Sequence, residues 1–120
     1  MRALVCKEYG PPSQLILDDL DDPKPSKGQI LIKVKAAGIN FPDVLSIEGK
    51  YQVKTEPPFI PGNEASGIIE AVGEGVERFK PGDQVITMSK GGAFAEKCVS
   101  DENTTIPLFP ALNFSQGAGF

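Results

Sequence analysis

Hydrophobic residues along this chain fall into short runs separated by turn-forming residues, a pattern typical of strands and loops. Brief apolar runs at 2–7 and 15–20 lie on either side of Gly10-Pro11-Pro12, and they predict two strands joined by a loop. From residue 29 onward apolar and polar residues alternate, which predicts a half-buried strand. Its apolar face holds Ile30, Ile32, Val34 and Ala36, and its polar face holds Lys33 and Lys35.

Further short strands are predicted in the second half of the chain, at residues 68–72, 85–88, 93–99 and 104–106. Many short strands with little room between them for helices indicate a barrel or a sandwich with much non-local pairing. Pro-Gly pairs at residues 60–63 (IPGN) and 80–83 (KPGD) predict type II turns, because proline presets φ and glycine supplies a positive φ at the next position.

The glycines that follow the strand at 68–72 invite a dinucleotide-binding interpretation. Gly73-Glu74-Gly75 starts a G-x-G-x-x-G pattern, but Arg78 stands where the third glycine is needed. Pro81 would also stop the helix that must accept a pyrophosphate. A simple turn is therefore the favoured interpretation.

Two helical stretches are predicted. Residues 41–48 form one or two turns, with Pro42 at an early position that needs no donor and Gly49 as the stop signal. A second helix begins near Asn113 or Ser115, either of which is a good N-cap, and the chain ends before that helix could be stable alone. We therefore expect an interrupted element here. The apolar residues of the first stretch at i, i+3 and i+4 are Phe41, Val44 and Leu45.

Size and charge narrow the classes of function. The 120 residues suit one domain, and 12 basic against 16 acidic residues give a net charge of −4, which argues against nucleic acid or an anionic membrane as partner. Cys6 and Cys98 form no CxxC pair, so each is expected to be a small buried hydrophobe in a reducing compartment. Neither a signal peptide nor an apolar span is found, and a cytoplasmic location is expected.

Several segments, in order and spacing, resemble the N-terminal, GroES-like domain of the medium-chain dehydrogenase/reductase superfamily. They are AAGINFPDV at 36–44, PGNEASG at 61–67, GVERFKPGDQV at 75–85 and GGAFAEKCV at 91–99. The resemblance is greatest to the zinc-free quinone oxidoreductases related to zeta-crystallin. It implies a partly open GroES-like β-barrel with one or two short helices. Residues 1–112 would form the substrate-side domain, and 113–120 would start the helix toward a dinucleotide-binding domain absent from this chain.

The same resemblance implies that no metal is bound. The zinc-dependent alcohol dehydrogenases carry a cysteine at the position of Asn40 and a histidine at that of Asn63, and a neutral carboxamide is a poor substitute for either zinc ligand. No four-cysteine lobe is present either, and the sequence contains no histidine. Without a Lewis acid, we expect a substrate that delocalises its own charge, a quinone or another conjugated carbonyl.

Site residues follow from the matched positions. Asn40 is expected to face nicotinamide and substrate, or else to cap the helix. Tyr51 would line the substrate cleft and donate a hydrogen bond or proton, or else be a loop aromatic. Phe41 and Asp43 are placed on the cofactor side. For Asp43 a first-turn carboxylate is the alternative, and Glu64 is assigned a structural role.

The resemblance thus implies an NADPH-dependent oxidoreductase that passes hydride to a small conjugated carbonyl, with a full-length homodimer. The preference for NADPH over NADH rests on the resemblance alone. Two alternatives stay open: a freestanding GroES-like binding module without catalysis, and an enoyl-thioester reductase or alcohol dehydrogenase-like member of the same superfamily.

Overall fold

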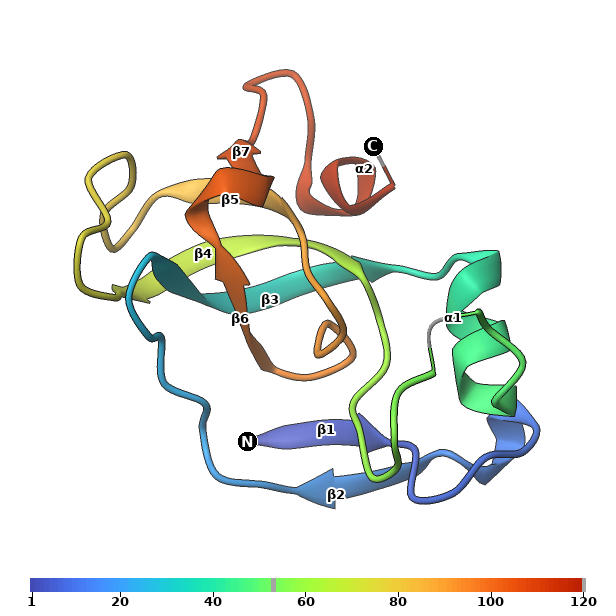
Figure 1. Ribbon diagram of the computed structural model, residues 1–120. Coiled ribbons are helices and arrows are strands. Elements are labelled where there is room, and N and C mark those ends of the chain that lie inside the picture. The colour runs from blue at the N-terminus through green and yellow to red at the C-terminus, as the bar shows by residue number, and fades with distance from the viewer. Residues whose placement is uncertain (53, 120) are drawn as a thin grey trace.

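A computed structural model describes residues 1–52 and 54–119 and shows a mainly β fold built from two antiparallel sheets (Figure 1). Strand β1 (Arg2–Val5) pairs with β2 (Ile16–Asp19) in the smaller sheet. The larger sheet has five strands in the order β6-β3-β4-β5-β7, so neighbours in space are often distant in sequence. Its strands are β3 (Gln29–Gly38), β4 (Glu64–Val72), β5 (Gln84–Met88), β6 (Lys97–Asp101) and β7 (Thr105–Pro107).

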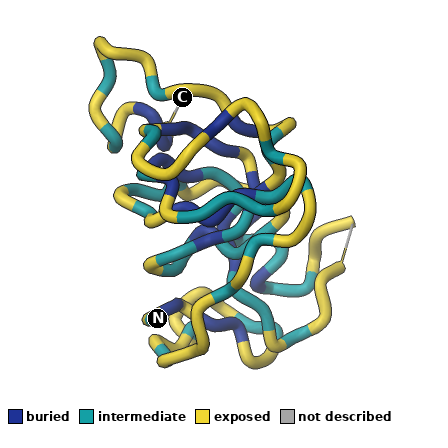
Figure 2. The backbone as a smooth tube through the Cα atoms, turned by 90° about the vertical axis from the view of Figure 1, so that its left-hand side faces the viewer, coloured by how far each residue is buried: buried dark blue, intermediate teal, exposed yellow. Residues whose placement is uncertain are grey.

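The hydrophobic core lies around β3 and β4, the long central strands. Figure 2 shows buried segments gathered in the middle of the molecule and exposed ones along the connecting loops. The predicted alternation in β3 is confirmed at its start, because Ile30 and Ile32 are buried and Lys33 and Lys35 are exposed. Leu31, on the other face, is also buried at 6% exposure, and the β3–β4 register shifts next to it. The main cluster comprises Ile30, Ile32, Ile69, Phe79, Val85 and Cys98.

The larger sheet curls, and side chains join its two edges. Ser100 on edge strand β6 and Thr105 on edge strand β7 both contact Thr87 of β5, whose Oγ1 lies 2.6 Å from Ser100 Oγ and 2.8 Å from Thr105 Oγ1. All three residues are buried. The described strands form no backbone ladder between β6 and β7, so this hydroxyl cluster, which we call the Thr87 seam, links the edges of a partly open barrel.

Helix α1 (Phe41–Glu48) has the predicted bounds, and Gly49 ends it with a φ of 73°. The predicted apolar face is wrong at its first position, because Phe41 is 74% exposed. The buried residues of α1 are instead Asp43 and Ile47. The helix therefore docks through Ile47 and through the hydrogen bond of the Asp43 carboxylate with Asn63, which an apolar periodicity does not detect.

Helix α2 (Phe114–Ala118) is capped by Asn113, one of the two predicted caps, whereas Ser115 lies inside the helix. Asn113 Oδ1 accepts the Gln116 N–H at 2.8 Å, and Gln116 Oε1 accepts the Asn113 N–H at 3.0 Å, which is a capping box. Gly117 and Ala118 are buried where α2 packs on β3, β4 and β5. Residue 120, the last of the predicted interrupted element, lies outside the described residues. In the described chain no helix is long and apolar enough to cross a membrane.

The turn predictions hold in part. Gly82 has a φ of 97°, and Asp83 N–H donates to the Lys80 carbonyl at 3.2 Å, as the predicted turn requires. Gly62 also has a positive φ, of 102°, but residues 60–63 bend without a hydrogen-bonded turn. The Ile60 carbonyl there accepts the Gly92 N–H at 2.7 Å. The Pro-Gly pair thus predicted the positive φ of Gly62 correctly, but the Ile60 carbonyl bonds to a distant loop and not within a turn.

Gly73 and its neighbours form a turn and not a phosphate loop, as predicted. Gly73 N–H donates to the Gln29 carbonyl at 2.7 Å, Gly28 N–H donates to the Glu74 carbonyl at 2.9 Å, and residues 76–83 contain no helix. The strand predicted at 93–99 begins later, at Lys97. Its expected first residues bond to residues 61 and 62 as a loop, because the N–H groups of residues 93 and 94 donate to those carbonyls.

Candidate functional site

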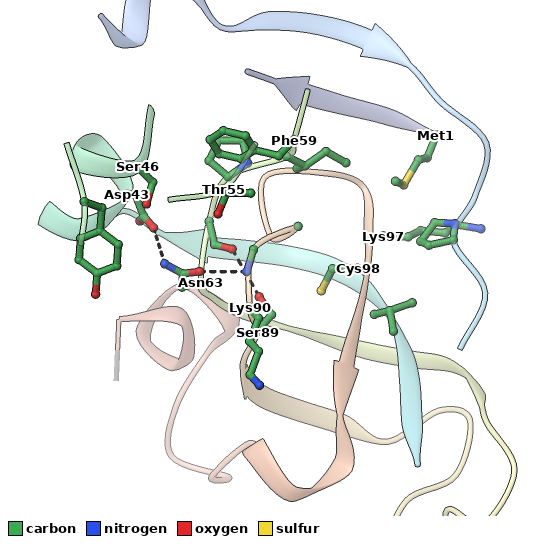
Figure 3. A pocket seen from close by; sticks show the side chains of 18 residues that line it. Met1, Asp43, Ser46, Thr55, Phe59, Asn63, Ser89, Lys90, Lys97 and Cys98 are labelled. Atoms are coloured by element: carbon green, nitrogen blue, oxygen red, sulfur yellow. Dashed lines mark hydrogen bonds between the residues drawn. The ribbon is translucent and has the colours of Figure 1, made fainter. Parts of the chain in front are cut away.

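A pocket of about 690 Å³ opens between α1, the segment at residues 59–63 and the loop at residues 89–92 (Figure 3). One end is polar and lies beside the first turns of α1. The other end is formed by β6 and by residues that precede β3. The side chains labelled in Figure 3 come from both ends and are Met1, Asp43, Ser46, Thr55, Phe59, Asn63, Ser89, Lys90, Lys97 and Cys98.

Asp43 is held at the polar end by two hydrogen bonds. Asp43 is 1% exposed, and its carboxylate accepts the Asn40 N–H at 2.8 Å through Oδ2 and Asn63 Nδ2–H at 2.9 Å through Oδ1. The position suits a carboxylate, because the first turn of a helix offers unpaired N–H groups and a positive dipole end. Both oxygens are thus engaged within the protein.

Asn63 joins α1 to the loop across the pocket. Besides donating to Asp43, its side chain accepts the Gly91 N–H through Oδ1 at 2.9 Å, and its backbone carbonyl accepts the Ser89 N–H at 2.8 Å. Figure 3 shows the Asn63 side chain between Asp43 and this loop. The donor side and the acceptor side of one amide therefore serve two different walls of the pocket.

The predicted site residues are partly brought together. Asp43 and Tyr51 line the pocket, and Tyr51 is 37% exposed. Asn40 and Phe41 lie outside it, exposed at the start of α1, and Asn40 reaches the site through its backbone bond to Asp43. The assigned roles of these four residues stay predictions. The burial of Asp43 favours an indirect role over contact with a cofactor.

Sequence reasoning missed the loop at residues 89–92. Gly91 and Gly92 have φ values of 83° and 87°, which only glycine adopts easily, and Lys90 and Ser89 contribute side chains to the pocket. A Gly-Gly pair is a recognised turn signal, so the loop itself was detectable. Its bond to Asn63 was not, because 28 residues separate Gly91 from Asn63.

The residues present do not fit a zinc ion. Within the described residues no three His, Cys, Asp or Glu side chains gather in a way that could hold a metal. At the pocket, the Asn63 oxygen already accepts the Gly91 N–H, and a neutral amide is a poor zinc donor. The donor set therefore departs from that of a catalytic zinc site.

At the far end of the pocket lie Lys97, which forms ion pairs with two carboxylates, and Cys98, a buried thiol. Lys97 Nζ lies 2.8 Å from Asp22 Oδ2 and 2.9 Å from Glu70 Oε2, and its hydrogen bonds to these carboxylates raise the pKa of Lys97. Burial raises the pKa of Cys98 to about 12. Cys98 is thus a neutral thiol at physiological pH and a poor nucleophile toward electrophiles in the pocket.

Comparison with known proteins gives a consistent result. Residues 26–115 match the family of alcohol dehydrogenase GroES-like domains. The chain is 44% identical over 120 residues to a quinone oxidoreductase from Rattus norvegicus, an alignment that covers 98% of this chain and 36% of the rat protein.

Solved structures agree with the sequence match. The human synaptic vesicle membrane protein VAT-1 homolog-like protein superposes with a TM-score of 0.96 at 33% identity, over 100% of this chain and 39% of that one. A quinone oxidoreductase from Thermus thermophilus, described with its NADPH complex, gives 0.84 at 32% identity, over 100% and 36% of the respective chains. The chain thus spans less than two fifths of the length of these relatives.

Proposed function

This chain belongs to the alcohol dehydrogenase GroES-like domain family, in the quinone oxidoreductase branch of the medium-chain dehydrogenases/reductases, and from that premise we propose a specific role. It forms the substrate-side domain of a zinc-independent, NADPH-dependent enzyme that reduces quinones or other conjugated carbonyls. Relatives named quinone oxidoreductase support the substrate class, and the NADPH complex of the Thermus thermophilus protein supports the cofactor.

The observation that carries the proposal is the use of Asn63 within the protein. Its amide is bonded at 2.9 Å to Asp43 on one side and to Gly91 on the other, so the pocket offers a hydrogen-bonded wall and no metal ligand at this position. A carbonyl reduced without a Lewis acid needs another way to spread negative charge. Conjugation provides it, which favours quinones and enones over simple aldehydes.

The start of α1 fits the nicotinamide end of a cofactor. Ile39 is 77% exposed and Phe41 is 74% exposed, so two apolar side chains flank Asn40 on an open surface that a planar ring can contact. Asn40 would hydrogen-bond the amide of that ring or the substrate oxygen. NADPH supplies the hydride when it is bound; the residues of this chain orient the substrate and exclude water.

Tyr51 is the proposed proton donor to the substrate oxygen. Its hydroxyl forms no hydrogen bond with the described part of the chain, and its ring lines the pocket. A phenol in that position can donate to the oxygen that gains charge as hydride arrives at the conjugated system. Water can supply the same proton, so Tyr51 assists the reaction without being indispensable.

The test uses the full-length protein. We expect NADPH oxidation to be fast with a quinone or an enone, slow with an unconjugated aldehyde, and unaffected by a strong chelator. The isolated 120 residues are expected to be inactive. A large preference in kcat/KM for an enoyl thioester, or loss of activity on chelation that zinc restores, would contradict the proposal. The homodimeric assembly and the cytoplasmic location stay predictions.

A further inference from the structure

Asp43 and Asn63 form a short hydrogen-bonded bridge across one end of the pocket. We call these two side chains the Asp43–Asn63 bridge. At one end the Asp43 carboxylate accepts the N–H of Asn40, the N-cap of α1, at 2.8 Å, and at the other end Asn63 accepts the Gly91 N–H at 2.9 Å. A hydrogen bond of 2.9 Å joins the two side chains. Both ends are backbone donors, so the bridge must present an acceptor at each end.

These three hydrogen bonds can all form only if one of the two side chains is a carboxylate and the other is an amide. Two acceptors must face the two N–H groups, and at the centre one side chain must donate while the other accepts. An Asp with an Asn satisfies all three bonds in either order. Two amides leave two donors opposed at one contact, however the groups flip, and two ionised carboxylates oppose charge at 2.9 Å.

The loop at residues 89–92 depends on such a tie. A side chain added at Gly92 would meet no atom within 4 Å, and one added at Gly91 would meet only the Ile60 carbonyl at 3.3 Å, so packing around these two glycines is sparse. The hydrogen bonds of the loop are the Gly91 N–H bond to Asn63 Oδ1, the Ser89 N–H bond to the Asn63 carbonyl, the Gly92 N–H bond to the Ile60 carbonyl at 2.7 Å, and the Ser89 hydroxyl bond to the Gly62 carbonyl at 3.4 Å. Position 63 accounts for two of these four bonds.

We propose that Asp43 and Asn63 are positioning residues that set the width of the substrate pocket. By tying the start of α1 to the loop at residues 89–92, the bridge fixes the distance between two walls of the pocket. Neither side chain touches the reacting atoms. The inference rests on the proposed reductase function and assigns it a determinant of substrate size.

The test is a swap cycle in the full-length protein. Asp43→Asn and Asn63→Asp each oppose like groups at the centre of the bridge. We expect each to lower kcat/KM for a bulky quinone by about 10- to 100-fold, because a shift of about 1 Å in a pocket wall costs that much. The loss should be smaller for a small enone. The double variant D43N/N63D restores all three bonds and should recover kcat/KM to within about threefold.

Two further measurements separate the possible outcomes. Asn103→Asp adds the same charge as Asn63→Asp on an exposed turn and should leave kcat/KM unchanged. Amide exchange at Gly91 reports the bridge without any substrate, and we expect faster exchange in the single variants and native exchange in the double variant. If the double variant regains stability and slow exchange but not kcat/KM, the bridge is only structural and the inference is overturned. If the wild-type protein reduces no conjugated carbonyl, the proposed function fails instead.

Discussion

At the scale of single residues, Asn63 shows how one polar side chain gains its meaning from its partners. The sequence places it in a Pro-Gly-Asn segment, and the resemblance places it at a metal-ligand position. The structure shows its amide bonded to Asp43 and to Gly91 at 2.9 Å each. No rule of local sequence could supply these partners, because they lie 20 and 28 residues away.

Tyr51 provides a test at the same scale. In the full-length protein we expect Tyr51→Phe to lower kcat for quinone reduction by less than about tenfold, since a general acid typically contributes 10²–10⁴-fold and water replaces most of it. KM should change little. Steady-state kinetics with one quinone and one enone measure both constants.

The control for this variant is Tyr9→Phe. The Tyr9 hydroxyl donates to the Thr55 carbonyl at 2.6 Å, so its removal disturbs the same loop without removing the pocket phenol. If Tyr9→Phe reproduces the kinetic change, the effect belongs to loop order. If Tyr51→Phe leaves kcat intact for every substrate, Tyr51 is an aromatic of the loop and not a proton donor.

At the scale of elements, the Thr87 seam explains how a short, strongly curled sheet is held at its open side. Each edge strand contributes one buried hydroxyl, Ser100 from β6 and Thr105 from β7, and Thr87 lies between them. Buried hydroxyls are costly unless each finds a partner, so the cluster also specifies which edges meet. Strand periodicity predicted these strands but not their closure.

Thr87→Val tests the seam by replacing a hydroxyl with a methyl group of similar size. We expect the free energy of unfolding to fall by about 1–3 kcal/mol, because Ser100 and Thr105 lose a buried partner. Urea denaturation of the full-length protein measures the change. The same substitution at the exposed Thr55 should stay within about 0.5 kcal/mol. Equal costs at the two sites would show that the seam adds nothing.

Helix α1 shows both sides of prediction at this scale. Pro42 and Gly49 are local signals, and they indicated bounds that agree with Phe41–Glu48. Which face the helix buries was decided by tertiary contacts: Asp43 bonds to Asn63, and Phe41 stays exposed. The exposure of Phe41 is the expected cost of a surface that the proposed function reserves for a ring.

At the scale of the whole molecule, paired and buried ionisable groups make the stability of the fold depend on pH. Hydrogen bonds from Lys7 and Lys97 lower the pKa values of Asp18 and Asp22 respectively. These groups stabilise the fold above the ordinary carboxylate range, and that contribution is lost as pH falls through their lowered pKa values. Burial raises the pKa of Cys98 to about 12, so the stability that this thiol contributes is lost as pH rises.

The alkaline side gives the sharper prediction. The folded state keeps a proton on Cys98 up to about pH 12, whereas the unfolded thiol loses it near its ordinary pKa. Stability from this group is therefore complete below about pH 8.5 and falls by up to about 1.4 kcal/mol per pH unit above it. Cys98→Ala should reduce that slope. Urea unfolding between about pH 8 and about pH 11 measures it, and an unchanged slope in the variant would contradict the assignment.

The sequence by itself determined the mainly β fold, the bounds of α1, the approximate start of α2 and the positive φ of Gly62 and Gly82. These features depend on proline, glycine and capping residues that act within a few positions of one another. The four segments at 36–44, 61–67, 75–85 and 91–99 also indicated the family. Only the tertiary structure decided the Asp43–Asn63 bridge and the Thr87 seam. Their hydrogen bonds join segments from different strands and loops, and such pairings depend on how the whole chain closes around its core.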